Sequence, residues 1–161
     1  TVEEYLELID ELKSEVPDIS LTTDIIVGFP GETDAQFQDT LNVMERIGYS
    51  SSFLFSYSPR PGTPANEFED SVPEDVKSRR LQEIIQLQNR LTEERGRFYK
   101  GKTIEILIEG NSTKPGYSYK GRNPQYWRVN ATGGEGLYKP GDRAQVQIEQ
   151  TSGHGLKGAI Q

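Results

Sequence analysis

The sequence has 161 residues, 33% of them hydrophobic, with no cysteine, one histidine and a formal net charge of −7. The absence of cysteine excludes disulfides, thiolate metal sites, a cysteine nucleophile and any iron–sulfur cluster held by this chain, and a single histidine excludes a histidine-rich metal site. Neither a transmembrane-length apolar run nor a secretory signal pattern occurs, so we expect a cytoplasmic location and no membrane partner.

The first third of the chain has an α/β pattern. Residues 1–4 fit a capping box that begins a helix, and Pro17 ends it. A strand is predicted over 20–27, a helix over 33–47 that stops at Gly48, and a second strand over 53–57. Strand, helix and strand at this spacing predict a βαβ unit.

The middle of the chain is predicted to be a loop followed by a long helix. Three prolines in residues 58–64 exclude a helix or a central strand there. A helix is predicted from residues 71–74 to Tyr99, with Gly101 ending it. Arg80 and Arg95 interrupt its apolar side, which consists of Val76, Ile84, Leu87, Leu91 and Phe98.

The last third changes period. Apolar and polar residues alternate over 104–109 and again over 145–149, and turn-forming clusters lie between these segments. Short strands at this spacing predict a small antiparallel barrel or sandwich.

The apolar strands of the βαβ unit are predicted to be buried on both faces, so they need neighbouring strands that this chain does not supply. A truncated barrel meets that requirement, and a small open sheet completed by oligomerisation is the alternative. Charge also divides the chain, because residues 1–72 contain 15 acidic and 3 basic residues and residues 100–161 contain 5 and 9. This imbalance indicates two units with different partners, although acids that only solvate the first helices would give the same pattern.

Candidate ligand-binding residues gather at the ends of the two strands. Asp24 and Glu32 form a conceivable acid–base pair, or they interact locally with their own backbone. The glycine loop 28–31 would let a flat ligand approach the backbone, although an ordinary Pro-Gly turn explains it equally. Arg60 suits a carboxylate or phosphate, or it pairs with Glu67, Glu69 or Asp70.

Bases and aromatic residues interleave in the last third of the chain, at Lys120, Arg122, Tyr126, Trp127 and Arg128. Cations for phosphates and rings for bases are the combination that binds single-stranded nucleic acid. The alternative interpretation places Trp127 in the core and the bases in solvent. His154, between two glycines, is interpreted as a turn residue.

Two segments resemble the radical-SAM methylthiotransferases. They are residues 23–33 (Thr-Asp-Ile-Ile-Val-Gly-Phe-Pro-Gly-Glu-Thr) and residues 55–65 (Phe-Ser-Tyr-Ser-Pro-Arg-Pro-Gly-Thr-Pro-Ala), and the second is most similar to the MiaB-type branch, which adds a 2-methylthio group to N6-isopentenyladenosine beside the tRNA anticodon. Residues 72–81 resemble the connecting helix of that family. Four short segments resemble the C-terminal TRAM domain of the same family. They are residues 106–110, 121–122, 129–130 and 156–158.

The resemblance implies an α/β plus all-β fold in three parts. Residues 1–72 would be the C-terminal part of a partial TIM-type barrel, residues 73–99 a connecting helix, and residues 100–161 a small TRAM β-barrel. The expected S-adenosylmethionine site comprises Ile26, Gly28, Phe29, Pro30, Tyr57 and Arg60. The expected contacts to the tRNA anticodon arm are Lys120, Arg122, Trp127, Arg128 and Asn130.

Enzymes of this family hold two [4Fe–4S] clusters on cysteines, which this chain lacks. The resemblance therefore implies that the catalytic and metal-binding residues lie in a missing N-terminal part of the same protein, and that these 161 residues alone are inactive. Two alternatives stay open. One is a stand-alone TRAM-type RNA-binding module with an α/β scaffold. The other is a different branch of the family, either the branch that acts on threonylcarbamoyladenosine or the branch that acts on a ribosomal protein.

Overall fold

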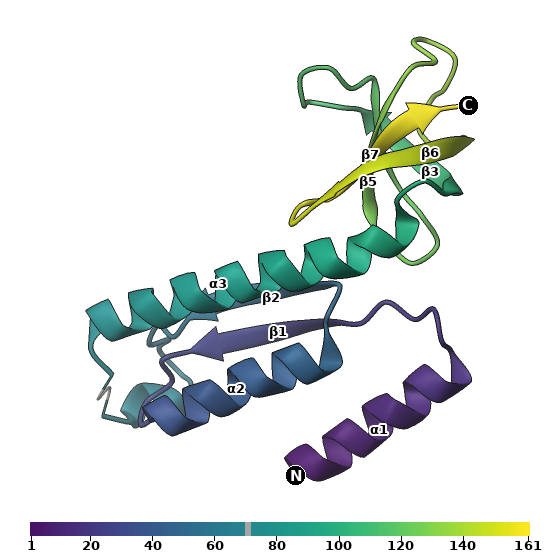
Figure 1. Ribbon diagram of the computed structural model, residues 1–161. Coiled ribbons are helices and arrows are strands. Elements are labelled where there is room, and N and C mark those ends of the chain that lie inside the picture. Colours follow the sequence, from purple (N-terminus) through teal and green to yellow (C-terminus); the bar gives the residue numbers. More distant parts are fainter. Residues whose placement is uncertain (70–71) are drawn as a thin grey trace. The chain divides into compact units, whose positions relative to one another are not determined.

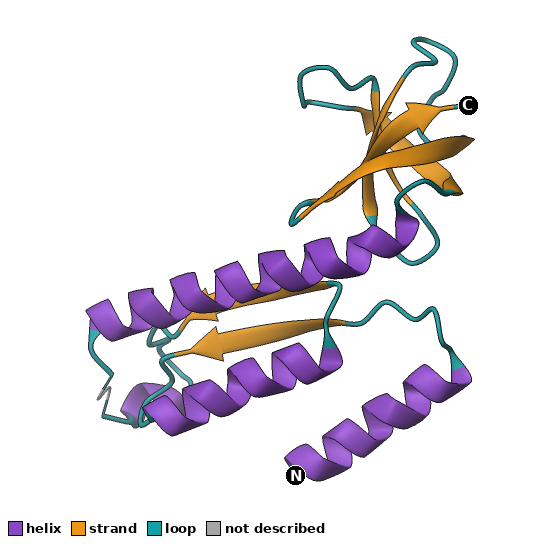
Figure 2. Ribbon diagram, in the orientation of Figure 1, coloured by secondary structure: helices purple, strands orange, loops and turns teal. Residues whose placement is uncertain are grey.

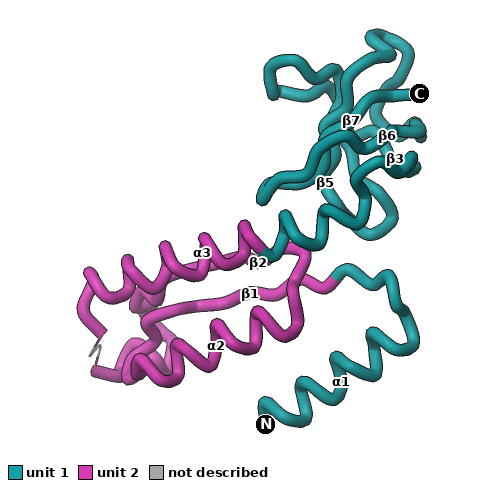
Figure 3. Tube along the Cα trace, viewed as in Figure 1, with its two compact units in different colours: residues 1–20, 91–161 teal, residues 21–90 magenta. Residues whose placement is uncertain are grey.

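The computed structural model describes residues 1–69 and 72–161 (Figure 1). The chain divides into two compact units, of which unit 2 comprises residues 21–90 and unit 1 comprises residues 1–20 and 91–161 (Figure 3). Helices and a two-stranded sheet make up unit 2, and most strands belong to unit 1 (Figure 2). Within the described residues, no helix combines the length and apolar character that a membrane crossing requires.

Helix α1 (Val2–Glu15) confirms the predicted capping box. The Glu4 amide donates to the Thr1 hydroxyl over 3.2 Å, and the Thr1 amino group donates to the Glu4 carboxylate over 2.6 Å. These bonds satisfy polar groups that the first turn of a helix leaves unpaired. Pro17 follows two residues after the end of the helix, where its ring blocks continuation.

Unit 2 contains the predicted βαβ unit. Strands β1 (Thr22–Val27) and β2 (Ser51–Ser56) pair in parallel, with Ile26 opposite Phe55. The structure therefore starts the first strand two residues later than the sequence prediction of 20–27, and it shifts the second strand from the predicted 53–57 toward the N-terminus. The shift has a physical reason, because the serines at 51 and 52 continue the ladder through their backbone although their side chains give no apolar signal.

Helix α2 (Asp34–Ile47) connects these strands and has both predicted caps. Thr33 and Gln36 form a capping box, and Gly48 adopts a left-handed φ of +64° after the last turn. Its buried residues are Phe37, Leu41, Met44 and Ile47. The spacing of these residues, which are four, three and three positions apart, places an apolar face in the core of unit 2.

The proline-rich loop departs from the prediction at its end. Pro64 begins a 3₁₀ helix, η1 (Pro64–Glu67), because a proline at the first helical position loses no hydrogen bond. The segment predicted to initiate the next helix includes Ser71, which lies outside the described residues.

Helix α3 (Glu74–Gly96) and the short 3₁₀ helix η2 (Arg97–Tyr99) occupy the predicted helical region. Two side chains are placed differently from the prediction. Arg80 is 3% exposed and belongs to the buried side, whereas Phe98 is 58% exposed. Arg80 tolerates burial because acidic partners surround its guanidinium, as described below.

Unit 1 contains a closed five-stranded barrel, so of the two predicted architectures the barrel is correct. Its strands, in the order β3-β4-β5-β7-β6, are β3 (Thr103–Asn111), β4 (Tyr119–Arg122), β5 (Arg128–Thr132), β6 (Arg143–Ser152) and β7 (Gly155–Ile160). Strands β5 and β7 pair in parallel, which corrects the expectation of a wholly antiparallel barrel. Strand β7 enters between β5 and β6 and closes the cylinder.

Alternation along the barrel strands generates the core. Ile106, Ile108, Val146 and Ile148 are at most 1% exposed, as the sequence pattern predicts. Trp127 packs in the same cluster. The remaining members of the cluster are Tyr119, Val129, Ala131, Ala144 and Leu156.

Candidate functional site

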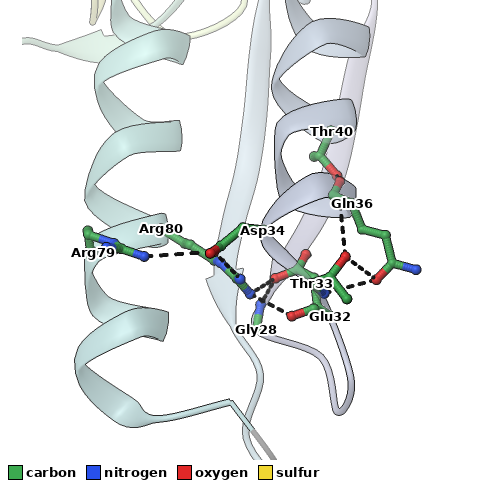
Figure 4. Close-up of polar contacts among 8 residues, drawn as sticks. All are labelled: Gly28, Glu32, Thr33, Asp34, Gln36, Thr40, Arg79 and Arg80. Atoms are coloured by element: carbon green, nitrogen blue, oxygen red, sulfur yellow. Dashed lines mark hydrogen bonds and ion pairs between the residues drawn. The ribbon is translucent and has the colours of Figure 1, made fainter.

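The loop that follows β1 is held by its own carboxylate. Gly28 has a φ of +72°, and its amide donates to Glu32 Oε2 over 2.7 Å (Figure 4). The Glu32 amide in turn donates to the Phe29 carbonyl over 2.9 Å. These contacts make a compact turn at the carboxyl end of the strand, where α/β folds commonly bind ligands.

Arg80 of α3 fastens this turn to the start of α2. Its Nη1 donates to the Glu32 carbonyl over 3.1 Å and to Glu32 Oε2 over 2.7 Å, and its Nη2 donates to Asp34 Oδ1 over 2.7 Å (Figure 4). The side chain of Arg80 is 4% exposed and that of Glu32 is 12% exposed. The hydrogen bond from Arg80, supported by its charge, lowers the pKa of the Asp34 carboxyl below its usual value of 3.8.

Glu32 is therefore engaged with Gly28 and Arg80, which favours the local interpretation of this carboxylate over an acid–base role. Asp24 lies on the exposed face of β1, opposite Phe53 of β2. Neither arrangement resembles two carboxylates that flank a reacting group.

Lys77 of α3 packs directly against the turn. A Cβ atom at position 28 would lie 2.4 Å from Lys77 Cγ, so Gly28 is required by the close approach as well as by its φ. Lys77 is 1% exposed, and its Nζ donates to Glu74 Oε1 over 2.9 Å. The same Nζ lies 5.5 Å from the centre of the Tyr57 ring.

Aromatic rings line the ends of the strands. Phe29 meets Tyr57 edge to face, with 5.2 Å between the ring centres, and Phe29 stays 41% exposed. The Tyr57 hydroxyl donates to the Ala65 carbonyl over 2.9 Å, which fixes that ring. The structure thus brings together Gly28, Phe29 and Tyr57, three of the predicted cofactor residues. Of the others, Pro30 is half-buried in the turn and Ile26 is exposed on the strand.

Arg60 lies on the proline-rich loop. Its side chain is exposed, and its carbonyl accepts a hydrogen bond from the Thr63 hydroxyl over 2.8 Å. Among the described residues no ion pair joins Arg60 to Glu67 or Glu69, and the third predicted partner, Asp70, lies outside them. The guanidinium therefore remains accessible to a carboxylate or phosphate.

The described residues do not form a cluster of metal-ligating side chains. The sequence contains no cysteine, and the described residues include no group of three or more histidine, cysteine, aspartate or glutamate side chains placed to hold a metal ion.

The outer surface of the barrel carries a row of polar and basic residues. Lys120 of β4 lies opposite Asn130 of β5, which lies opposite Lys157 of β7. Cross-strand partners point to the same side of a sheet, so these three side chains share the outer face. The Ser112 hydroxyl donates to Asn130 Oδ1 over 2.9 Å and orients that amide.

Arg122 and Arg128 are opposite each other in the same two strands, two positions from that row. Arg128 is exposed, whereas Arg122 donates from Nε to Glu109 over 2.8 Å and lies 4.1 Å from the centre of the Tyr126 ring. Trp127 is 6% exposed and packs in the core, which favours the core interpretation of this residue over direct contact with RNA.

Sequence reasoning missed several residues of these two surfaces. Lys77 and Arg80 reach the strand-end turn from a helix more than forty residues away, and no local motif reveals such a contact. Lys157 lies between the buried Leu156 and Gly158, so the alternation of the strand predicts that its side chain points outward. Its place beside Asn130 depends on the parallel pairing of β5 with β7, which the sequence does not reveal.

One cavity of about 290 Å³ lies within unit 1. The cavity is lined by residues 17–20, by residues at the end of α3 and in η2, and by Trp127. Arg95 of α3 connects the helix to residues 17–20, because its Nη2 donates to the Ile19 carbonyl over 3.3 Å. Partial burial raises the pKa of Tyr99, which also lines the cavity.

Comparison with known proteins extends over the whole chain. Residues 97–160 match the TRAM domain. The chain is 45% identical over 161 residues to the tRNA-2-methylthio-N(6)-dimethylallyladenosine synthase of Protochlamydia amoebophila, and it covers 35% of that protein. The synthases of the same name from Acetivibrio thermocellus and Carboxydothermus hydrogenoformans are 41% and 42% identical to this chain over 160 residues. The chain covers 33% and 36% of the lengths of these two proteins. The chain thus spans about a third of the length of these relatives.

Proposed function

This chain contains a TRAM domain and is homologous from end to end to part of the tRNA-2-methylthio-N(6)-dimethylallyladenosine synthases, and we propose that it is the C-terminal portion of such an enzyme. The complete enzyme would be a cytoplasmic methylthiotransferase that adds a 2-methylthio group to N6-isopentenyladenosine beside the anticodon. The single observation that carries this proposal is identity of 40% or more along the entire chain.

In this proposal residues 1–72 complete a partial TIM-type barrel and residues 100–161 bind RNA. Residues 73–99 form the helix that connects these two parts. The exposed face of the parallel sheet supports the first part. Ile26, Phe53 and Phe55 share that face and are 53%, 63% and 51% exposed. Parallel sheets are normally covered on both faces, so strands or side chains from the missing polypeptide would cover this one.

The cofactor in this proposal is S-adenosylmethionine, held at the ends of β1 and β2. Phe29 suits such a ligand because it offers an exposed ring at this turn, whereas Lys77 covers Gly28 and the Gly28 amide is bonded to Glu32, so that Gly28 shapes the turn. Bound S-adenosylmethionine would supply the 5′-deoxyadenosyl radical of the reaction. Ile26, Pro30, Tyr57 and Arg60 would complete the pocket, with Arg60 toward the methionyl group or substrate.

Two [4Fe–4S] clusters do not fit this chain. Such clusters are held by cysteine thiolates, and the sequence contains none. Their ligands would belong to the missing N-terminal portion, so we assign no catalytic or metal-binding residue here.

A chimeric enzyme tests the enzymatic part of the proposal. When the chain replaces the equivalent 35% of the Protochlamydia synthase, we expect methylthiolation of isopentenylated tRNA, measured by mass spectrometry of its nucleosides. The unfused chain should give none, because it lacks cysteine. The relative's own segment, fused across the same junction, is the matched control. A folded chimera with no product, beside an active control, would contradict the assignment.

The proposed RNA surface is the outer face of the barrel. Lys120, Asn130 and Lys157 form one row across β4, β5 and β7, and Arg122 and Arg128 form the next. Residues 100–161 also carry more basic than acidic residues, in contrast to the acidic first part. Cations on one curved surface bind the phosphates of RNA.

Salt dependence tests this surface. We expect the double variant Lys120→Ala and Arg128→Ala to bind an anticodon-arm hairpin more weakly, with a slope of log affinity against log salt that is smaller by roughly one for each phosphate interaction that the substitutions remove. Fluorescence anisotropy at several salt concentrations measures both quantities. Lys139→Ala is the matched control, since Lys139 is also exposed but lies in the turn before β6. Equal slopes in the double variant and the wild type would contradict an RNA role for this face.

A stand-alone RNA-binding module is the second candidate. The barrel favours it by having a closed sheet and a core of its own. The net charge of −7 opposes strong unassisted binding. Nanomolar binding of the hairpin by the unfused chain at physiological salt, together with an inactive chimera, would favour this module over the enzyme fragment.

A further inference from the structure

Tyr126 has an unusual backbone conformation and an exposed ring. It lies in the connection between β4 and β5, is 69% exposed, and has a φ of +66°. It is the only non-glycine residue with a positive φ among residues 1–69 and 72–161. Aromatic side chains rarely adopt this conformation because it is strained, and burial of the ring does not compensate here.

The neighbours of Tyr126 impose this conformation. The Tyr126 amide donates to the Asn123 carbonyl over 2.9 Å, and the Trp127 amide donates to Asn123 Oδ1 over 2.8 Å. Asn123 and Trp127 are 5% and 6% exposed, so both ends of the turn are anchored in the barrel. The turn therefore presents the Tyr126 ring outward from a fixed base.

A cation lies against the ring. The Arg122 guanidinium is 4.1 Å from the ring centre, and its Nη1 donates to the Tyr126 carbonyl over 3.3 Å. Glu109 also holds the same guanidinium, with 2.8 Å between Arg122 Nε and Glu109 Oε1. The ring is thus fixed before any ligand binds, which lowers the entropy lost when something stacks on it.

The surroundings of the ring indicate which ligand would stack on it. Arg128 lies opposite Arg122 across β4 and β5, and Lys120 lies on the outer face two residues before Arg122. An exposed ring beside phosphate-binding cations is the arrangement that receives an unpaired nucleobase. Backbone strain at a residue whose ring is not buried is a further reason to look for a binding role.

We propose that Tyr126 is a stacking residue for an unpaired base of the RNA that binds the barrel, with Arg122 as the residue that positions its ring. This inference rests on the proposed RNA-binding function and adds one named base contact to it. It also divides the surface into two kinds of contact, in which Lys120 and Arg128 hold phosphates and Tyr126 holds a base.

Stacking and phosphate binding respond differently to salt, and this difference provides the test. The probe is an anticodon-arm hairpin with 2-aminopurine in its loop, bound by the complete 161-residue chain. We expect Tyr126→Leu to lose about 5- to 150-fold in affinity while the salt slope stays that of the wild type. We expect Tyr126→Phe to retain affinity and the quenching of 2-aminopurine. Leu137→Ala, which removes a 76% exposed side chain from another turn of the barrel, should bind like the wild type.

Tyr126→Gly separates binding from folding. Glycine adopts a positive φ without strain, so we expect this variant to melt no lower than the wild type and still to lose affinity as Tyr126→Leu does. Unchanged affinity in Tyr126→Leu, or a loss accompanied by a smaller salt slope, would overturn the stacking role and leave the RNA surface intact. Absence of salt-dependent binding by the wild type would instead overturn the RNA surface, and the stacking role with it.

Discussion

Replacing Gly158 by alanine is expected to destabilise the barrel by about 3 kcal/mol, because the strands leave no space for a methyl group. Gly158 of β7 lies opposite Ala131 of β5 and Ile148 of β6. A Cβ atom there would lie 2.0 Å from the Gln147 carbonyl oxygen and 2.9 Å from Val146 Cγ1. Relief requires backbone movement in a strand that is hydrogen-bonded on both sides.

Urea unfolding followed by tryptophan fluorescence measures this effect, since Trp127 is the only tryptophan and lies in the barrel core. Gly116→Ala is the matched control. A Cβ at Gly116 meets nothing within 4 Å, so the cost is confined to its φ of +82° and should be about 1 kcal/mol. Equal losses in the two variants would show that β6 and β7 can separate to admit the methyl group.

The substitution Arg80→Met is expected to destabilise unit 2 by about 3–5 kcal/mol. Methionine fills much of the same volume but leaves the Glu32 carboxylate, only 12% exposed, without its cationic partner. The turn after β1 should loosen with it, because Arg80 also holds the Glu32 carbonyl. Arg79→Met is the matched control. Arg79 is 66% exposed and 3.8 Å from Asp34, so its loss should cost less than about 1 kcal/mol.

Hydrogen exchange of the β1 and β2 amides measures the loss in unit 2, and an NMR titration of Asp34 identifies its cause. The folded pKa of Asp34 lies below the usual 3.8, so the pairing stabilises the folded state above about pH 4 and is lost as the pH falls through the folded pKa. In Arg80→Met the Asp34 pKa should return toward 3.8. If exchange rates and the titration both stay unchanged, the ion-pair cluster does not stabilise this turn.

Local signals predict much of the fold. The threonine caps at Thr1 and Thr33 and the left-handed Gly48 fixed three helix ends, because each of these residues bonds to groups within four positions of itself. The alternation around Ile106 and Val146 predicted the inward faces of two barrel strands for the same reason, since neighbouring positions on a strand point to opposite sides.

Features that depend on distant partners were not predictable. Arg80 appeared to interrupt an apolar helix side, because its acidic partners at 32 and 34 are brought to it only by folding. The parallel pairing of β5 with β7 likewise arises from the closure of the barrel. No residue pattern within either strand specifies its neighbour.

The residues of the candidate sites also divide into those that a local motif predicts and those that only the folded structure reveals. The motifs at the strand ends located Gly28, Phe29 and Tyr57, which the structure brings to one place because parallel strands end at one edge. Trp127 and Tyr126 are adjacent aromatic residues in a turn, where side-chain direction has no fixed period. Only the structure distinguishes the buried ring from the exposed one.

The position of β7 has a consequence for the speed of folding. β7 is the last barrel strand in the sequence, yet it pairs with both β5 and β6, and β6 must also find β3 some forty residues earlier. Contacts between distant segments slow folding, because loop entropy is lost before they form. During synthesis the open edges of β5 and β6 therefore stay exposed until β7 has left the ribosome, and this interval is when the chain is most prone to aggregation.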